Sequence, residues 1–304
     1  MEPCSVLEHC SNKASTSTPI AMQIANVDRC LSLIETLAEA PAGLALGSLA
    51  ERLELPKSAT HRLLQTLASR GYVEQDPGSQ NYGLSLKVAT LGFRYLDARR
   101  LPDVAQEAID ALAHATGEYC RLAVVEGEGL VWIARAQGAT QGLRYDPPMG
   151  RDVVLHATAT GKAWLATLPE QQALRIVCAR GFGTPPGFGA LALRNVDELR
   201  KHLDQTRRRG YAVAVEEGEP GTVALAAVFR ASDAPGAPVA GTVSIAGPRV
   251  RLGDARVAEL APLLLETTRE IAKRWPLRTR QRTRAGAALA ARDPAPSRRK
   301  DHVR

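Results

Sequence analysis

The segment LPKSATHRLLQTLASRGYVEQD, residues 55–76, carries several side chains that could bind phosphates and bases. At roughly 100° per residue, one arc of a helix in this segment is polar and has no acidic residue. That arc holds Lys57, Ser58, His61, Arg62, Gln65 and Ser69. Positive charge beside short hydrogen-bonding groups suits phosphate oxygens and base edges. The arc therefore predicts a nucleic-acid contact, with a solvated helix face as the simpler alternative.

The opposite arc of the same helix is apolar and predicts how the polar arc is held in place. It contains Ala59, Thr60, Leu63, Leu64 and Leu67, a stripe typical of a helix that packs on a core. Pro56 stands where a helix start tolerates proline. We therefore expect a helix over residues 57–70 with one buried face and one exposed face.

Short elements on both sides place this helix in a larger motif. Upstream, GLALGSLAERLEL predicts a short helix over residues 46–53, and only two or three residues separate it from the next helix. Two helices joined this tightly form a helix-turn-helix, whose second helix enters the major groove. A third helix is expected from the apolar spacing of Val27, Cys30, Leu31, Ile34, Leu37 and Ala38. Downstream, YVEQDPGSQNYGL predicts a β-hairpin that turns at residues 76–79.

Three helices followed by a hairpin describe a winged helix-turn-helix. This context favours DNA binding over a merely solvated helix face, and the expected partner is double-stranded DNA. The residues expected to contact it are Lys57, Ser58, Thr60, His61, Arg62 and Gln65.

Composition allows folded domains and excludes several classes of protein. With 304 residues, 45% of them hydrophobic, the chain can form two domains with real cores. No apolar run approaches ~20 residues and no signal-peptide pattern is found, so we expect a soluble, cytoplasmic protein without a membrane partner. The five cysteines are odd in number and scattered, which argues against a disulfide framework. Cys4, His9 and Cys10 offer at most three metal ligands, so neither a metal site nor a cofactor is expected.

The net charge of +7 comes from one end of the chain. Residues 273–304 hold eleven Lys and Arg residues against two Asp residues, an excess of nine positive charges. The remainder of the chain therefore carries about two net negative charges. The prediction of DNA binding accordingly depends on the local pattern around residues 57–70 and not on the total charge.

Patterns along the chain predict five segments. Residues 1–19 are rich in Ser and Thr and predict disorder, residues 20–84 form the winged helix-turn-helix, and residues 85–102 form a linker helix. Residues 103–275 form a second domain, and residues 276–304 form a basic, disordered tail. The second domain is expected to contain helices at 103–117, 156–168, 195–210 and 254–274, a hairpin at 119–136, and strands at 211–215, 223–230 and 239–246. Helices that flank an antiparallel sheet give an α+β fold of the GAF or PAS type.

Patterns that suggest catalysis do not hold. The Thr-Gly-Lys at residues 160–162 lacks two parts of a phosphate loop, because His156 stands at the glycine position and Ala163 at the Ser or Thr position. No G-x-S-x-G supports a Ser-His-Asp hydrolase. The carboxylates of Glu216, Glu217 and Glu219 could form an acid–base set, but solvated carboxylates on a strand-end turn are the preferred interpretation. We therefore expect a protein that is not an enzyme.

Four blocks of the sequence resemble the IclR family of bacterial transcriptional regulators. The blocks are LPKSATHRLLQTL followed by GY, HATATGKAWLA, GYAVAVEEGEPG and GTVSIAGPRVRL, and the likeness spans about residues 22–275. The resemblance implies a winged-helix domain, a linker helix, and a C-terminal domain that binds a small metabolite. It also implies a homodimer or homotetramer on palindromic promoter sites. Ala59 and Thr60 replace the family's commoner Thr-Val, which could alter base preference.

The resemblance also implies an effector pocket lined from four places. These are the turn into a helix at His156, Thr158, Ala159, Thr160 and Gly161, the strand position Ala214, the next strand at Thr222 and Ala224, and the last strand at Ser244 and Ala246. Plain packing of a sheet is the alternative for each of these residues. Free N–H groups at the helix start would suit an acidic ligand.

Three of these positions are polar in family members that bind small acids, and here they are Ala214, Ala224 and Ala246. Smaller side chains predict a wider pocket with fewer hydrogen-bond partners. We therefore expect an effector larger and more apolar than glyoxylate or pyruvate, such as an aromatic or branched acid. A ligand-responsive transcriptional regulator is the preferred interpretation, and an enzyme that acts on a small metabolite through residues 103–275, with an appended winged helix, is the alternative.

Deleting residues 277–304 tests whether the basic tail reads DNA sequence. The tail has no apolar periodicity, so its excess charge should act by counterion release, without sequence preference. We expect the truncated protein to keep its preferred site, lose nonspecific affinity and show a shallower dependence on salt in fluorescence anisotropy. A lost site preference would instead assign sequence recognition to the tail.

Overall fold

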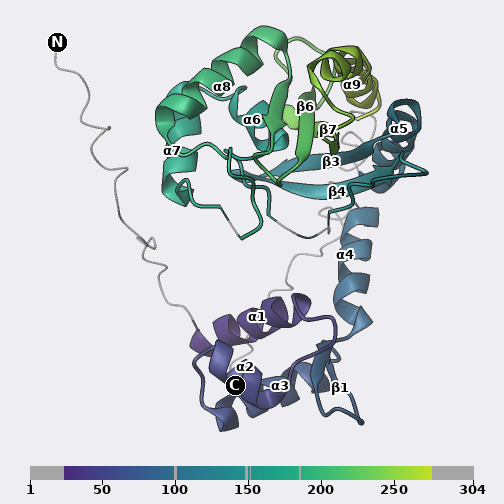
Figure 1. Cartoon of the computed structure of the whole chain (residues 1–304). Helices are drawn as coiled ribbons and strands as arrows, with labels where there is room; N and C mark the ends of the chain where they lie inside the picture. The colour runs from purple at the N-terminus through teal and green to yellow at the C-terminus, as the bar shows by residue number, and fades with distance from the viewer. Residues whose placement is uncertain (1–23, 99–100, 148–149, 151, 185, 276–304) are drawn as a thin grey trace, which may run out of the picture. The chain divides into compact units, whose positions relative to one another are not determined.

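The computed structural model describes residues 24–98, 101–147, 150, 152–184 and 186–275 (Figure 1). The chain divides into two compact units, one up to Ala98 and the other from Arg99. Both segments predicted to be disordered, 1–19 and 276–304, lie outside the described residues. No described helix is both long and apolar enough to cross a lipid bilayer.

The first unit is the predicted winged helix-turn-helix. Helices α1 (Ala25–Ala38), α2 (Leu46–Arg52) and α3 (Lys57–Ser69) precede the antiparallel strands β1 (Val73–Gln75) and β2 (Tyr82–Leu84). Their shared core consists of Leu33, Leu37, Leu49, Leu64, Leu67, Val73 and Tyr82. The hairpin turns where the sequence predicts it, because Asp76 Oδ1 accepts hydrogen bonds from the Ser79 backbone N–H at 2.6 Å and the Ser79 hydroxyl at 2.7 Å.

The buried face of α1 differs from the one expected from its apolar spacing. Val27 and Leu31, expected in the core, are 55% and 53% exposed, whereas Leu33 is completely buried. Leu37 is buried as expected, and Cys30 and Ile34 are partly buried. The apolar stripe of α1 has Leu33 at one edge and Leu31 at the other, and only the Leu33 side is buried, so spacing alone could not select which part of the stripe contacts the core.

Helix α4 (Leu86–Ala98) follows the hairpin and has no buried residue. Its apolar side chains include Leu86, which is 83% exposed, and Phe93, which is 70% exposed. At its start, the Lys87 ammonium lies 4.6 Å from the centre of the Tyr72 ring. The predicted linker helix is therefore present, with an apolar surface that the first unit does not cover.

The second unit is an α+β domain around a five-stranded antiparallel sheet, as predicted. The strands are β3 (Tyr119–Glu126), β4 (Gly129–Gln137), β5 (Ala212–Val215), β6 (Thr222–Arg230) and β7 (Val239–Pro248), in the spatial order β4-β3-β7-β6-β5. The helices are α5 (Leu101–Thr116), α6 (Ala159–Leu165), α7 (Glu170–Arg180), α8 (Val196–Arg209) and α9 (Asp254–Arg274). Helix α7 is the element that the sequence analysis did not predict.

The two faces of the sheet pack against different helices (Figure 1). Helices α5 and α9 cover the face that carries Cys120, Leu122, Val243 and Ile245. Helix α6 lies against the other face, where small residues such as Ala212, Ala214 and Ala226 allow close approach. Side chains alternate between the two faces along each strand. The residues that lie between those packed under α5 and α9 therefore point towards α6.

Gly161 allows helix α6 to approach the backbone before it. A Cβ at Gly161 would lie 2.3 Å from the Leu155 carbonyl oxygen, closer than two such atoms can come. We expect Gly161→Ala to lower the free energy of unfolding by about 1–3 kcal/mol in urea denaturation, since the backbone must shift. Gly183→Ala is the matched control, because nothing lies within 4 Å of its Cβ position. Equal stability of the two variants would contradict the packing argument.

Candidate DNA interface and effector cavity

The outer face of helix α3 presents the polar side chains predicted from the sequence. Lys57, Ser58, Arg62 and Gln65 are exposed, and His61 is partly exposed. The turn before α3 contains Glu54 at φ 53°, and the N–H of Leu55 closes it by donating to the Ala50 carbonyl at 2.9 Å. The tight turn and the buried Leu64 and Leu67 fix α3 against the core, so its outer face is available to a partner.

Thr60 requires a correction. Its side chain is completely buried, and its hydroxyl donates to the Pro56 carbonyl at 3.1 Å. A buried hydroxyl that already has an acceptor cannot contact a base or a phosphate. We therefore remove Thr60 from the residues expected to bind DNA, and its position in the apolar arc explains its burial.

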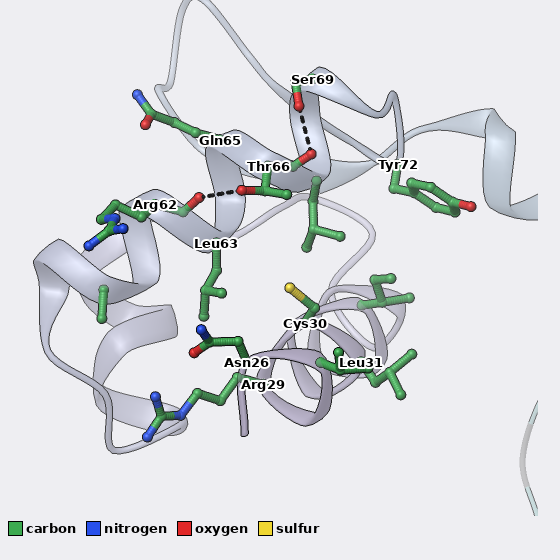
Figure 2. A pocket seen from close by; sticks show the side chains of 14 residues that line it. Asn26, Arg29, Cys30, Leu31, Arg62, Leu63, Gln65, Thr66, Ser69 and Tyr72 are labelled. Carbon is green, nitrogen blue, oxygen red and sulfur yellow. Dashed lines mark hydrogen bonds between the residues drawn. The ribbon is translucent and has the colours of Figure 1, made fainter. Parts of the chain in front are cut away.

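A groove of about 910 Å³ separates the inner flank of α3 from α1 (Figure 2). In it Leu63 points towards α1 and the thiol of Cys30, while Gln65 extends away from α1 (Figure 2). The Thr66 hydroxyl donates to the Arg62 carbonyl at 3.0 Å, and the Ser69 hydroxyl donates to the Thr66 carbonyl at 2.9 Å. These two hydroxyls already serve the helix backbone, so the predicted DNA contacts that the structure leaves in place are Lys57, Ser58, His61, Arg62 and Gln65.

A small cavity in the second unit lies between the sheet and the start of α6. Its lining is Arg121, Trp132, Tyr145, Ala157, Thr158, Ala159, Thr160, Ala214, Gly218, Thr222, Ala224, Ser244 and Ala246. Eight of the ten residues predicted to bind the effector are among these. The register explains the assembly of the sheet side: Ala214 pairs with Ala224, Ala224 pairs with Ala246, and Ser244 pairs with Arg121. Residues directly opposite on neighbouring strands share one face.

His156 and Gly161 do not line this cavity. The His156 side chain is buried with its ring centre 5.2 Å from that of Phe182. The Gly161 N–H donates to Thr158 Oγ1 at 3.0 Å, so it is not free to bind an acid as expected from the sequence. Thr158 is the N-cap of α6, and its side chain satisfies the donor that a ligand would otherwise meet.

The cavity is also much smaller than its alanines predict. Its volume is about 40 Å³, and its lining includes the large side chains of Arg121, Trp132 and Tyr145 beside the alanines. The expectation of a wide cavity is therefore wrong for this structure. The sequence analysis did not identify these three residues. The available signal was the lone Arg121 in the apolar strand YCRLAVV, where its neighbours Cys120 and Leu122 predict the opposite face.

A buried ion pair lies behind the cavity, outside its lining. The Lys162 ammonium donates to the two Glu217 carboxylate oxygens at 2.6 and 2.7 Å, and the two side chains are 0% and 4% exposed. Burial lowers the pKa of Lys162 and raises that of Glu217, and their mutual attraction opposes both shifts. The interpretation of Glu217 as a solvated carboxylate is therefore wrong, since a lysine of α6 distant in sequence covers it.

His202 of α8 completes this buried cluster. Its Nδ1 lies 3.2 Å from the Lys162 ammonium nitrogen. Burial, together with the nearby Lys162 charge, lowers the pKa of His202 to about 4, so the ring is neutral at pH 7 and can accept a hydrogen bond. The cluster joins α6, α8 and the turn after β5, which carries the cavity residue Gly218.

A winged helix-turn-helix followed by an α+β domain with a polar-lined cavity is the architecture of a ligand-responsive DNA-binding regulator. The helix-turn-helix domain model of the IclR family matches residues 26–77. The model described as "Bacterial transcriptional regulator IclR C-terminal" matches residues 93–273. The chain belongs to the IclR family of bacterial transcriptional regulators, as the four sequence blocks predict.

Individual relatives match over most of their length. The acetate operon repressor of Salmonella typhimurium is 31% identical over 260 residues, which cover 85% of this chain and 92% of the relative. The glycerol operon regulatory protein of Streptomyces coelicolor is 32% identical, covering 84% of this chain and 96% of the relative. A crystal structure of an IclR homolog complexed with 4-hydroxybenzoate, from Microbacterium hydrocarbonoxydans, has the same fold. It is 20% identical with a TM-score of 0.66 and covers 86% of this chain and 99% of its own.

These comparisons decide between the two interpretations left open by the sequence. The family consists of transcriptional regulators, and the relatives named above are a repressor and an operon regulatory protein. They support the regulator, and they give no support to an enzyme with an appended winged helix.

The Lys162–Glu217 pair makes a stability prediction. Glu217→Gln leaves the buried Lys162 ammonium without a counter-charge, and we expect it to lower the free energy of unfolding by about 3–5 kcal/mol in urea denaturation. Replacing both residues, as Lys162→Met with Glu217→Leu, should recover much of this loss because no unpaired charge remains.

The exposed pair Arg175–Glu128 supplies the control. Its nitrogen and oxygen are 2.5 Å apart, but both side chains are more than half exposed, so Glu128→Gln should have little effect on stability. A Glu217→Gln protein as stable as the Glu128→Gln protein would show that the buried pair does not hold this region together.

Proposed function

We propose that helix α3 enters the major groove of promoter DNA and that a small-molecule effector, bound in the cavity of the second unit, changes the affinity for that DNA. The observation that carries the proposal is the acid-free outer face of α3, exposed on a helix whose opposite face is buried. Arg62 and Gln65 suit base edges, and Lys57, Ser58 and His61 suit phosphates or bases.

An organic acid is the class of effector that we propose, with aromatic acids included. The cavity combines an apolar floor of Ala214, Ala224 and Ala246 with the hydroxyls of Thr160 and Ser244. An apolar floor beside a few polar groups is typical of a ligand site. The Microbacterium homolog complexed with 4-hydroxybenzoate supports an acid, and because the cavity is small, a ring requires the side chains that fill it to move.

A homodimer or homotetramer is the proposed functional form. Two-fold symmetric regulators place two recognition helices on successive major grooves of a palindromic site. The uncovered apolar side chains of α4, including Leu86 and Phe93, support an assembly through this helix. A regulator of promoters would act in the cytoplasm.

The proposal is tested with Arg62→Ala. Genomic fragments selected by the full-length protein would supply the cognate site. If Arg62 reads a base, we expect a loss of about 1–3 kcal/mol in binding to this site by fluorescence anisotropy, and relaxed specificity at one base pair. The melting temperature should change little, because Arg62 is exposed.

Arg208→Ala is the matched control. It removes the same charge from an exposed position of α8 in the other unit, so it should leave site-specific affinity unchanged. If Arg62→Ala and Arg208→Ala bind the cognate site alike, α3 is not the recognition helix.

A further inference from the structure

Arg121 carries positive charge into the cavity. It lies on the cavity face of β3, directly opposite Ser244 on β7. Its Nε is buried and has no hydrogen-bond partner among the described residues. A buried donor without an acceptor is costly, and such a group in a native protein calls for an explanation.

Two aromatic rings lie close to the Arg121 guanidinium. Its central carbon lies 4.0 Å from the centre of the Trp132 ring and 5.4 Å from that of the Tyr119 ring. Stacking on a ring uses a face of the planar guanidinium and leaves its edge, with the N–H groups, available for hydrogen bonds in the plane. Within the described part of the chain, no carboxylate forms an ion pair with Arg121.

Tyr145 is one polar neighbour of Arg121 in this structure, and the Glu219 carboxylate acts on both groups, because its negative charge favours the Arg121 cation and raises the pKa of Tyr145. Burial raises the pKa of Tyr145 to about 12, and the Arg121 charge acts against that shift. The phenol is therefore protonated at pH 7 and offers Arg121 only a neutral oxygen. A guanidinium prefers a carboxylate, which binds with two parallel, charge-assisted hydrogen bonds.

We propose that Arg121 binds the carboxylate of the effector, and that the Tyr145 side chain occupies this place until the effector arrives. The inference rests on the proposed effector site and names its anchoring residue. The ligand class is a monocarboxylic acid whose apolar, preferably flat, body lies on the alanine floor, with the Ser244 hydroxyl beside the carboxylate.

Tyr145 must move for such a ligand to fit, because about 40 Å³ cannot hold an aromatic ring. The segment that carries Tyr145 is fastened at two points: the Gln137 side-chain amide donates to the Tyr145 carbonyl at 2.8 Å, and Arg251 donates to the Leu143 carbonyl at 2.6 Å. Both bonds hold the backbone and not the phenol ring, which packs edge-on against Tyr119 with 5.7 Å between the ring centres. An acid that binds Arg121 would therefore displace the Tyr145 phenol, and this movement would transmit ligand binding to the segment that carries Tyr145.

The test compares acids with neutral molecules of the same shape. Binding of benzoate and 4-hydroxybenzoate, and of benzamide and 4-hydroxybenzamide, would be measured by calorimetry on the full-length protein. We expect the wild type to bind the acids about 10- to 100-fold more tightly than the amides. Arg121→Met should abolish this preference, and Arg121→Lys should restore part of it, since lysine keeps the charge but not the planar fork.

Arg208→Met is the matched control, since Arg208 is an exposed arginine of α8 and lies outside the cavity lining. It should keep the acid preference of the wild type. Tyr145→Phe removes the group that competes for Arg121, so it should bind the acids more tightly, by about 2- to 10-fold. A merely structural Arg121 would not produce that gain. This variant also keeps the test decisive if Arg121→Met does not fold, as checked by cooperative thermal unfolding.

Two results would overturn the proposal. One is an acid preference that survives in Arg121→Met, and the other is a wild type that binds none of the four probes or binds acids and amides alike. Site-specific DNA binding, measured on the same preparations, separates these results from a failure of the proposed regulatory function, which would appear as a loss of DNA recognition by the wild type.

Discussion

The two-residue period of the five-stranded sheet is the constraint on which the rest of the second unit depends. Because successive side chains point to opposite faces, Cys120 and Leu122 enter the core under α5 and α9, while Arg121 enters the cavity. A shift of one residue in the pairing of β3 with β7 would exchange these sets and place a guanidinium in an apolar core. The core therefore enforces the register, and the register places the polar groups of the cavity.

The cavity itself reflects a balance between small and large side chains. Alanines on β5, β6 and β7 leave space above the sheet. Large side chains also enter the lining: Arg121 from β3, Trp132 from β4, and Tyr145 from the segment after β4. The result is a small site with a cation at one wall instead of a wide apolar pocket. Behind it, the Lys162–Glu217 pair joins α6 to the turn after β5, so both walls of the cavity belong to one connected structure. Such a pair adds little net stability, but the removal of one partner is costly, which resists local rearrangement.

The first unit obeys a similar rule with helical periodicity. Leu64 and Leu67 hold α3 on the core, and the same rotation that buries Thr60 exposes Arg62 and Gln65. The side chains proposed to contact DNA and those that stabilise the domain thus occupy opposite sides of one helix. Exposed substitutions can then alter affinity for DNA without a large effect on folding.

The sequence by itself determined the element order, the winged helix-turn-helix, the antiparallel sheet and most of the cavity lining, because these depend on local periodicity, turn residues and family-specific blocks. The final helix, predicted over residues 254–274, has these bounds in the structure. Only the tertiary structure decided which side of α1 is buried. Its apolar stripe includes both Leu33 and Leu31, and packing against the rest of the first unit buries Leu33 and leaves Leu31 exposed. The tertiary structure also decided that Glu217 is paired and that Arg121, Trp132 and Tyr145 fill the cavity. Lys162 and Glu217 are 55 residues apart, and Arg121 pairs in register with Ser244 of a neighbouring strand that is distant in sequence, so no local pattern could reveal either pairing.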